Sequence, residues 1–262
     1  MKHASQEETL RAYYGTLFRS WGPQHWWPAR TRFEMIVGAY LTQNTAWTNV
    51  ELALRGLRAE GLLSMDGIRR IPQSKLEALI RSAGYFRQKA RRLKIFVAFL
   101  DKRYGGSLDR MFSKPTESLR EELLSLNGVG PETADSILLY AGNHPVFVVD
   151  AYTRRILDRH EILPEKAGYE EFRELFERAL EPVADEVFEV ASESHPPVLA
   201  QPAFRGSSHT PSPVSKAKRT AIAQVYNEMH GLIVRVGKHY CLKSKPRCGE
   251  CPLARYLIGR EK

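Results

Sequence analysis

Asp150 is the residue whose type and setting first suggest chemistry. It follows the apolar run Val146 to Val149 and directly precedes a helix-like segment that begins at Ala151 and carries three arginines. A carboxylate at a helix N-terminus receives backbone N–H groups, which keep it ionised at neutral pH. Such a group can stabilise positive charge on a reacting molecule and orient or deprotonate a water. Asp150 could equally serve only as the cap of the helix at Ala151, and both roles are open at this point.

A glycine-rich turn lies about 20 residues before this aspartate. An apolar helix is expected to end at Leu126, Gly128 and Gly130 flank Val129 in a tight turn, and Pro131 suits the first position of the next helix. A hairpin of this kind between two helices exposes backbone N–H groups that can bind a phosphate oxygen. The motif alone is also compatible with a plain corner between two helices.

Three cysteines lie close together near the end of the sequence. Cys241, Cys248 and Cys251 form a C-x6-C-x2-C pattern, and Leu257 follows after five further residues. Three cysteines cannot make a fully paired disulfide framework, so a reducing compartment is expected. Thiolates at such short spacing are typical of metal ligands.

Helices must position these residues. Apolar residues recur at helical spacing along most of the chain, and alternating strand patterns are nearly absent. The first clear helical stripe consists of Phe33, Ile36, Val37, Tyr40 and Leu41. We therefore predict an all-α protein of about ten to twelve short helices. Between 190 and 215 the helical pattern gives way to Pro, Ser, His and Gly, which predicts a flexible insertion.

The net charge of +9 is unevenly distributed. Residues 84–114 carry nine Lys or Arg and two Asp, and residues 216–262 carry eleven Lys or Arg and three Glu. Residues 165–189 carry nine acids and three bases. Two basic blocks separated by an acidic one are expected of a chain that lies along a polyanion. Solvated helix surface would give the same pattern.

Composition excludes several classes of protein. An apolar fraction of 43% and an aromatic fraction of 10% exclude a mainly disordered chain. The N-terminus has no apolar core typical of a secretory signal, and no apolar stretch approaches the roughly 20 residues that a membrane helix requires. We therefore expect a cytoplasmic protein with no membrane partner.

The hairpin and the run that ends at Asp150 resemble the helix-hairpin-helix DNA glycosylases of the endonuclease III superfamily. The resemblance covers residues 33–159 and resumes at 226–257. It implies two helical lobes, a six-helix lobe over 31–144 that carries the hairpin and a second lobe from 1–30 plus 145–262. DNA would lie across the cleft between them, with Gly128, Val129 and Gly130 on its backbone. Asp150 would then be the catalytic aspartate at the junction of the lobes.

Glu132 is an informative departure from part of this family. Members that also nick the DNA strand carry a lysine here, whose amine forms a Schiff base with the sugar. A glutamate cannot form an imine, so the resemblance predicts a monofunctional glycosylase that releases a base with water, with Glu132 as a possible acid. A bifunctional glycosylase/AP lyase, a mismatch glycosylase and a non-catalytic DNA-binding protein are the alternatives.

The closest subgroup in motif is that of the 3-methyladenine DNA glycosylases on this fold. The resemblance implies a base pocket of Trp26, Trp27, Pro28 and Trp47, although each aromatic could instead be core. An aromatic sandwich favours a cationic alkylated purine over its neutral parent. Mismatched thymine or adenine and oxidised pyrimidines compete as substrates.

The subgroup implies two further roles. Gln43, with Asn44 as second candidate, would fill the hole that the flipped nucleotide leaves in the DNA. Lys238 would lie beside Asp150.

The family's iron-sulfur loop reads C-x6-C-x2-C-x5-C, so the cysteine loop at 241–257 has three ligands in register and Leu257 in place of the fourth. Three interpretations are open. In the first, a [4Fe-4S] cluster would be held by the three cysteines and another group. In the second, the cluster would have been lost, and in the third, zinc would bind with His239 or His230 as fourth ligand. Lys243, Lys245 and Arg247 would contact the DNA backbone in each case. The implied partner is damaged double-stranded DNA, bound by a monomer.

Overall fold

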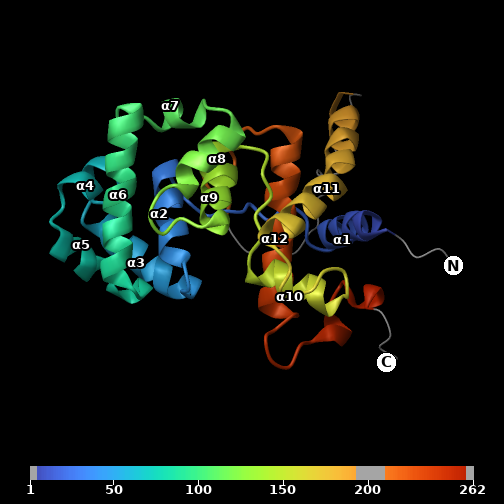
Figure 1. The fold of residues 1–262 in the computed structure, drawn as a ribbon. Helices are drawn as coiled ribbons and strands as arrows, with labels where there is room; N and C mark the ends of the chain where they lie inside the picture. Colours follow the sequence, from blue (N-terminus) through green and yellow to red (C-terminus); the bar gives the residue numbers. More distant parts are fainter. Residues whose placement is uncertain (1–4, 193–209, 258–262) are drawn as a thin grey trace. The chain divides into compact units, whose positions relative to one another are not determined.

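The computed structural model describes residues 5–192 and 210–257, with side chains omitted from 185 to 192. Over these residues the chain forms twelve α-helices and no strand, which confirms the predicted all-α class (Figure 1). The chain divides into two compact units, one of residues 29–144 and one of residues 1–28 with 145–262. None of the described helices is long and apolar enough to cross a membrane.

The unit of residues 29–144 contains eight α-helices where six were expected. Four of the eight, α4, α5, α7 and α9, are only five to seven residues long, so the count depends on whether such short helices are included. The elements are α2 (Arg32–Thr42), α3 (Trp47–Ala59), α4 (Met65–Arg70), α5 (Gln73–Leu79), the 3₁₀ turn η1 (Arg81–Ala83), α6 (Phe86–Tyr104), α7 (Leu108–Phe112), α8 (Thr116–Leu124), α9 (Pro131–Ser136) and the π-helical turn η2 (Ile137–Ala141).

The core of this unit forms around α2. Every residue of α2 from Phe33 to Leu41 is buried, and the helix packs against α3, α6, α9 and η2. Thr31 caps its N-terminus by accepting a hydrogen bond from the backbone N–H of Glu34 at 3.0 Å. A helix that is buried on every side is enclosed by its neighbours, so α2 is the centre of this core.

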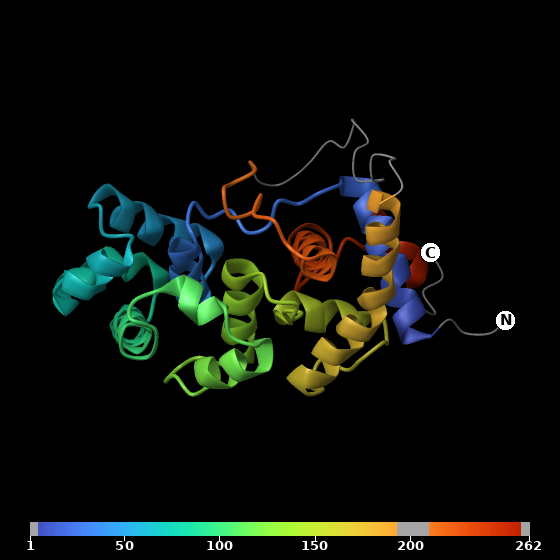
Figure 2. The same ribbon diagram turned by 90° about the horizontal axis from the view of Figure 1, so that it is seen from above.

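The second unit is built from both ends of the chain. It contains α1 (Gln6–Trp21), α10 (Ala151–Arg159), α11 (Tyr169–Ser192), α12 (Ala221–His239) and the 3₁₀ turns η4 (Cys248–Glu250) and η5 (Ala254–Tyr256). In Figure 2 α12 is seen nearly end-on, with α10 and α11 packed beside it.

Gly237 allows α10 to approach α12 closely. A Cβ at this position would lie 2.2 Å from the ring of Tyr152. The N-terminus of α10, where Asp150 stands, is therefore anchored on α12 by the Tyr152 ring, which packs directly on the backbone at Gly237.

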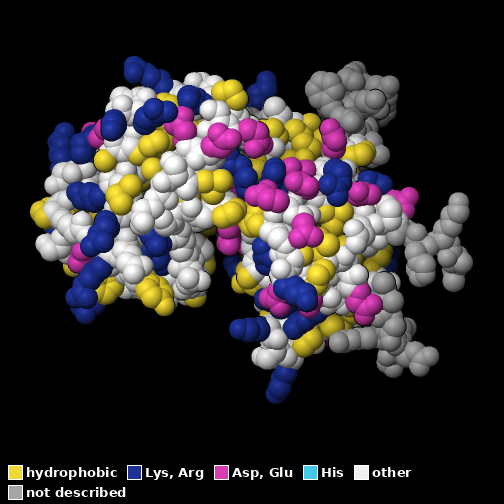
Figure 3. Space-filling view, in the orientation of Figure 1, with side chains coloured by type: hydrophobic (Ala, Val, Ile, Leu, Met, Phe, Trp, Pro, Cys, Tyr) yellow, Lys and Arg dark blue, Asp and Glu magenta, His cyan; other side chains and the backbone are white. Residues whose placement is uncertain are grey.

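The predicted insertion at 190–215 lies mostly outside the described residues. Helix α11 continues to Ser192, and a turn is present at Ser212 to Ser215, where each of these two serines accepts a hydrogen bond from the other's backbone N–H. Figure 3 shows acidic side chains gathered over α11 and basic ones along α6. The acidic stretch is thus largely the surface of one helix.

Candidate active site

Asp150 is the N-cap of α10. Its Oδ1 accepts hydrogen bonds from the backbone N–H of Thr153 at 2.8 Å and from the Thr153 hydroxyl at 2.9 Å. The capping role considered from the sequence is therefore real, and it occupies one oxygen of the carboxylate. The other oxygen is available for a different task.

The second oxygen of Asp150 faces a buried histidine that the sequence analysis had offered only as a zinc ligand. Nε2 of His230, on α12, lies 3.6 Å from Asp150 Oδ2. The imidazole is enclosed by aromatic rings, with Phe147 at 6.3 Å and 84° and Trp26 at 6.3 Å and 67°. Asp150 and His230 thus form a carboxylate–imidazole pair, with the carboxylate side chain 14% exposed.

The charge state of Asp150 follows from two opposing effects. Burial raises the pKa of the carboxyl group, but the neighbouring His230 imidazole and the two hydrogen bonds from Thr153 outweigh it. The net pKa lies below its usual value, so the group is ionised at neutral pH. An ionised carboxylate beside an imidazole can stabilise positive charge and accept or relay a proton from water.

Gln24 and Trp26 also lie against α12. The backbone N–H of Gln24 donates to Glu228 Oε2 at 2.7 Å, and a Cβ at Gly231 would lie 3.1 Å from Cβ of Trp26. Trp26 and Trp27 are buried, with ring centroids 5.3 Å apart and planes tilted by 58°. The structure therefore brings the predicted aromatic segment, Trp26 above all, close to the imidazole that faces Asp150.

Lys238 lies exposed near the end of α12, with its ammonium 5.6 Å from the centroid of the Trp26 ring. The side chain that faces Asp150 from α12 is His230, eight residues earlier. The predicted place of Lys238 beside the aspartate stays a prediction, whereas its contact with the aromatic segment is direct.

Glu228 is a second buried titratable group that sequence reasoning missed. Burial raises its pKa to about 7, against the lowering effects of the Gln24 N–H, the charge of Arg219 and the hydrogen bond from Gln224. A glutamate on the apolar face of a predicted helix was the available signal, since such a residue is seldom buried without partners.

The hairpin lies within the unit of residues 29–144. Gly128 has φ of 80°, and Val129 N–H donates to the Leu126 carbonyl at 3.0 Å. The guanidinium of Arg92 lies so close over Gly128 that a Cβ there would be 1.9 Å from its Nε. Pro131 is the first residue of α9, as expected, and Glu132 is exposed at the second position.

Gln43 is bonded to this hairpin. Its Nε2 donates to the Gly128 carbonyl and to the Thr133 hydroxyl, each at 2.9 Å, and its Oε1 accepts from Arg92 Nη1 at 2.7 Å. Asn44 follows as an exposed residue with φ of 51°. Of the two residues expected to enter the DNA, Gln43 thus braces the hairpin and Asn44 projects from the loop.

Two buried groups hold this loop and hairpin in place. Lys89 donates from Nζ to the Leu41 carbonyl at 2.9 Å, the Thr45 hydroxyl at 2.7 Å and the Ala83 carbonyl at 2.8 Å. Arg120 on α8 binds Asp135 on α9 through two hydrogen bonds, at 2.7 and 3.1 Å, and Asp135 is fully buried. The first group fixes the loop at 43–46 and the second joins the two helices of the hairpin.

The cysteine loop is held by arginines of α10. Arg159 donates from Nη1 to Cys241 Sγ at 3.2 Å and to the Leu242 carbonyl at 2.6 Å, and Arg155 donates from Nε to the Cys241 carbonyl at 2.7 Å. The predicted DNA contacts Lys243, Lys245 and Arg247 are all exposed.

The predicted metal centre falls on the cysteine loop of 241–257 and on the two candidate histidines. Within the described ranges no group of three or more His, Cys, Asp or Glu side chains could hold a metal ion, and Leu257 offers no donor atom. His230 faces Asp150, and His239 is exposed at the end of α12. The three interpretations of the loop with Cys241, Cys248 and Cys251 therefore stay predictions.

Comparison with known proteins decides the family. Residues 37–182 match the family model of the HhH-GPD superfamily base excision DNA repair proteins. The chain belongs to the HhH-GPD superfamily. A relative, a putative DNA repair glycosylase of Methanocaldococcus jannaschii, is 39% identical over 254 residues, which are 97% of each chain. This confirms the resemblance drawn from the hairpin and from Asp150.

Solved structures agree. A 3-methyladenine DNA glycosylase of H. pylori bound to 1,N6-ethenoadenine has a TM-score of 0.68 and 27% identity, covering 90% of this chain and 98% of that one. A trapped endonuclease III–DNA covalent intermediate has a TM-score of 0.66 at 19% identity, covers 98% of this chain and 97% of that one, and supports the fold alone. This HhH-GPD chain is thus a DNA glycosylase of base excision repair, and DNA is its partner.

Proposed function

We propose that the chain is a monofunctional DNA glycosylase that releases an alkylated purine by attack of water, with Asp150 as the catalytic residue. The observation that carries the proposal is the divided carboxylate of Asp150, with one oxygen bonded to Thr153 and the other facing His230. The capping oxygen fixes the side chain, and the remaining oxygen is oriented for chemistry.

The reaction balances with these groups. The electrons of the N-glycosidic bond leave with the base, and positive charge develops on the sugar ring opposite the Asp150 carboxylate. Water then attacks the sugar carbon and gives a proton to Asp150. His230, which faces the same carboxylate oxygen, stabilises the Asp150 side chain during this step. An alkylated purine is already cationic, so its departure requires no strong general acid.

Glu132 supports water rather than an amine as the nucleophile. It is exposed at the second position of α9, where strand-nicking members of the family are expected to carry a lysine, and a carboxylate forms no imine. Incubation with damaged duplex and borohydride should trap no covalent complex. A trapped complex in the wild type that is lost in Lys238→Met would assign lyase chemistry to the amine beside Trp26 and contradict the proposal.

The choice of base rests on the aromatic segment. The ring of Trp26 already attracts the Lys238 ammonium at 5.6 Å, so its face is suited to a cation. The 27% identical H. pylori structure, by its own description a 3-methyladenine glycosylase, supports the same substrate class. Trp27 and Pro28, from the same segment, would complete the pocket, whereas Trp47, in the unit of residues 29–144, stays a prediction.

Base release from a panel of duplexes tests the proposal. Duplexes with 3-methyladenine, thymine glycol, uracil and a mismatch should be compared, and we expect release of the alkylated purine. Asp150→Asn should slow this release roughly 100- to 10,000-fold while DNA affinity is retained, because an amide oxygen can still cap α10 but carries no charge.

Asp158→Asn is the matched control. Asp158 is exposed on the same helix, where it accepts a hydrogen bond from the Glu165 N–H at 2.9 Å, and its replacement should leave the rate unchanged. Failure of the wild type to release any base would favour a non-catalytic DNA-binding protein instead. Release of mismatched bases alone would contradict the proposed alkylated-purine substrate and make the chain a mismatch glycosylase.

A further inference from the structure

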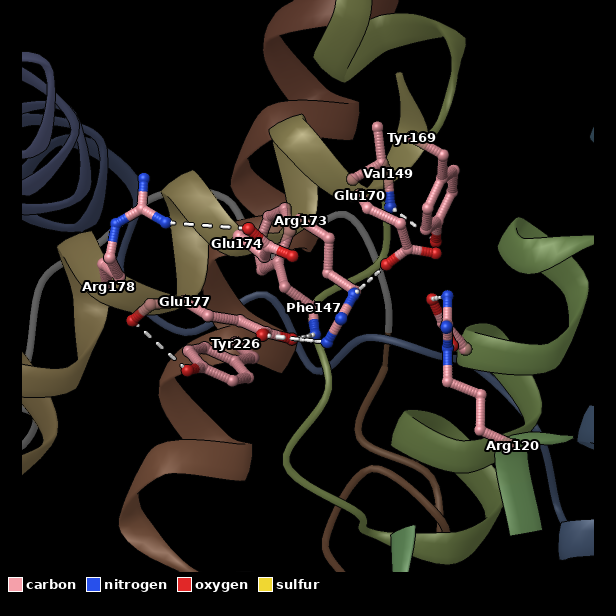
Figure 4. Close-up of polar contacts among 11 residues, drawn as sticks. Arg120, Phe147, Val149, Tyr169, Glu170, Arg173, Glu174, Glu177, Arg178 and Tyr226 are labelled. Carbon is pink, nitrogen blue, oxygen red and sulfur yellow. Dashed lines mark hydrogen bonds and ion pairs between the residues drawn. The ribbon is translucent and has the colours of Figure 1, made fainter. Parts of the chain in front are cut away.

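The five residues before Asp150 form an extended segment without regular secondary structure. Along 145–149 two alternate N–H groups point to α11. The N–H of Phe147 donates to Glu177 Oε1 at 2.9 Å, and the N–H of Val149 donates to the Tyr169 hydroxyl at 3.2 Å (Figure 4). Two side chains of α11 thus take the place that the carbonyls of a neighbouring strand would have in a sheet.

Glu177 is itself fixed. Arg173, one turn earlier on α11, donates from Nη1 to both carboxylate oxygens of Glu177, at 3.1 and 3.0 Å, and from Nε to Glu170 Oε2 at 2.6 Å. The Tyr226 hydroxyl of α12 donates to the backbone carbonyl of Glu177 at 3.3 Å (Figure 4). A hydrogen-bond acceptor held by so many partners has little freedom to move, which suits it to fix a backbone segment.

The side chain of Phe147 connects this support to the candidate active site. Its ring stacks on Phe176 of α11 with centroids 4.2 Å apart and planes at 5°, and it meets Tyr226 edge-on at 5.9 Å. The same ring forms one wall around His230. A shift of the Phe147 backbone would therefore move both the segment that leads to Asp150 and the surroundings of His230.

We propose that Glu177 and Tyr169 are positioning residues for the glycosylase reaction. They fix the backbone of 147–149 so that Asp150 Oδ2 stays in register with His230 while Oδ1 caps α10. The inference rests on the proposed function. Neither residue touches the reacting atoms, and both act through the main chain.

The expected effect follows from the geometry. A displacement of a catalytic group by about 1 Å can cost on the order of a hundredfold in rate. Glu177→Ala and Tyr169→Phe each remove one acceptor for a backbone N–H, so each should slow single-turnover base release by about 10- to 100-fold without weakening DNA binding. Glu177→Gln keeps a carbonyl oxygen toward Phe147 and should restore most of the rate.

A second readout separates positioning from general loss of structure. The pKa of the Asp150 carboxyl is held below its usual value against burial by His230 and Thr153. Looser register with His230 should raise that pKa, so the acidic limb of the pH–rate profile and the carboxyl titration seen by NMR should both move to higher pH. Burial, and secondly the charge of Asp150, raises the pKa of Tyr152 on α10, and this residue is unchanged in every variant.

Glu174→Ala is the matched control. Glu174 lies on the same helix and pairs only loosely with Arg178, at 3.8 Å, with its side chain 56% exposed. Its loss should leave rate and carboxyl titration at wild-type values.

The outcomes are distinct. Rates in Glu177→Ala and Tyr169→Phe equal to that of Glu174→Ala would overturn the inference, as would equal losses in Glu177→Gln and Glu177→Ala with an unchanged Asp150 titration. A wild type without base release would overturn the proposed function instead. In that case the NMR titration alone still supports or refutes the fixing of Asp150 by α11.

Discussion

Lys89 provides a test in which stability should rise with pH. Its side chain is 1% exposed on α6, and the ammonium is bonded to Leu41, Thr45 and Ala83. Burial, and secondly the positive charge of Arg92, lowers the pKa of Lys89 from 10.5 to about 8. The folded protein therefore releases this proton before the unfolded chain does.

The sign and size follow from proton binding. Between pH 8 and pH 10.5 the unfolded chain holds more protons at Lys89 than the folded protein, so the free energy of unfolding rises with pH in this window. At about 1.36 kcal/mol per unit of pKa difference, the full gain is about 3.4 kcal/mol, of which about 2 kcal/mol appears between pH 7 and about pH 9.5.

Urea unfolding at several pH values measures this gain. The free energy of unfolding of the wild type should climb relative to that of Lys89→Met, a side chain of similar length without a titrating proton. Burial raises the pKa of Tyr13, Tyr14, Tyr40 and Tyr226, and their unfolded-state ionisation above about pH 10 acts equally on both proteins. Lys102→Met, an exposed lysine of the same helix, serves as control. Parallel curves for wild type and Lys89→Met would refute the reasoning.

Two further predictions concern the unit of residues 29–144, which carries the hairpin. Asp135→Asn leaves Arg120 buried without its counter-charge and should lower the free energy of unfolding by about 3–5 kcal/mol, measured by urea unfolding against the exposed control Glu121→Gln. Asn44→Gly should slow base release at nearly unchanged stability, because glycine also adopts the φ of 51° found at Asn44, whereas Gln43→Ala should lower stability by about 1–3 kcal/mol through its lost hairpin bonds. Reversed effects in this pair would make Gln43 the residue that enters the DNA.

Asp150 was predictable from the sequence because two local patterns identify it. An apolar run ends at the aspartate, and a Gly-x-Gly hairpin lies about 20 residues before it. That His230 faces Asp150 was not predictable from the sequence. Most of α12 is buried, so periodicity does not single out one residue of that helix as facing an aspartate 80 positions away. Such a contact depends on how α10 packs on α12, and this is set by Gly237 and Tyr152 rather than by any motif.

A count of charged residues along the sequence does not show which charges lie on the surface. Lys89 counts toward the basic block at 84–114, yet its ammonium is buried and bonded to three oxygens of the protein. Gln43 shows the same limit for an amide, since residue type indicates hydrogen-bonding capacity but not the partner. The all-α class was predictable because it depends on repeated apolar spacing, which many residues share.

The two tasks of the Asp150 carboxylate affect how activity is assigned to related sequences. Because one oxygen caps α10, selection for a stable fold alone would retain an aspartate here, even in a descendant that had lost catalysis. An aspartate at this position is therefore weak grounds for assigning activity by homology. His230 does not cap this helix, so under the proposed function a histidine that faces the second oxygen separates catalysis from capping better than the aspartate does.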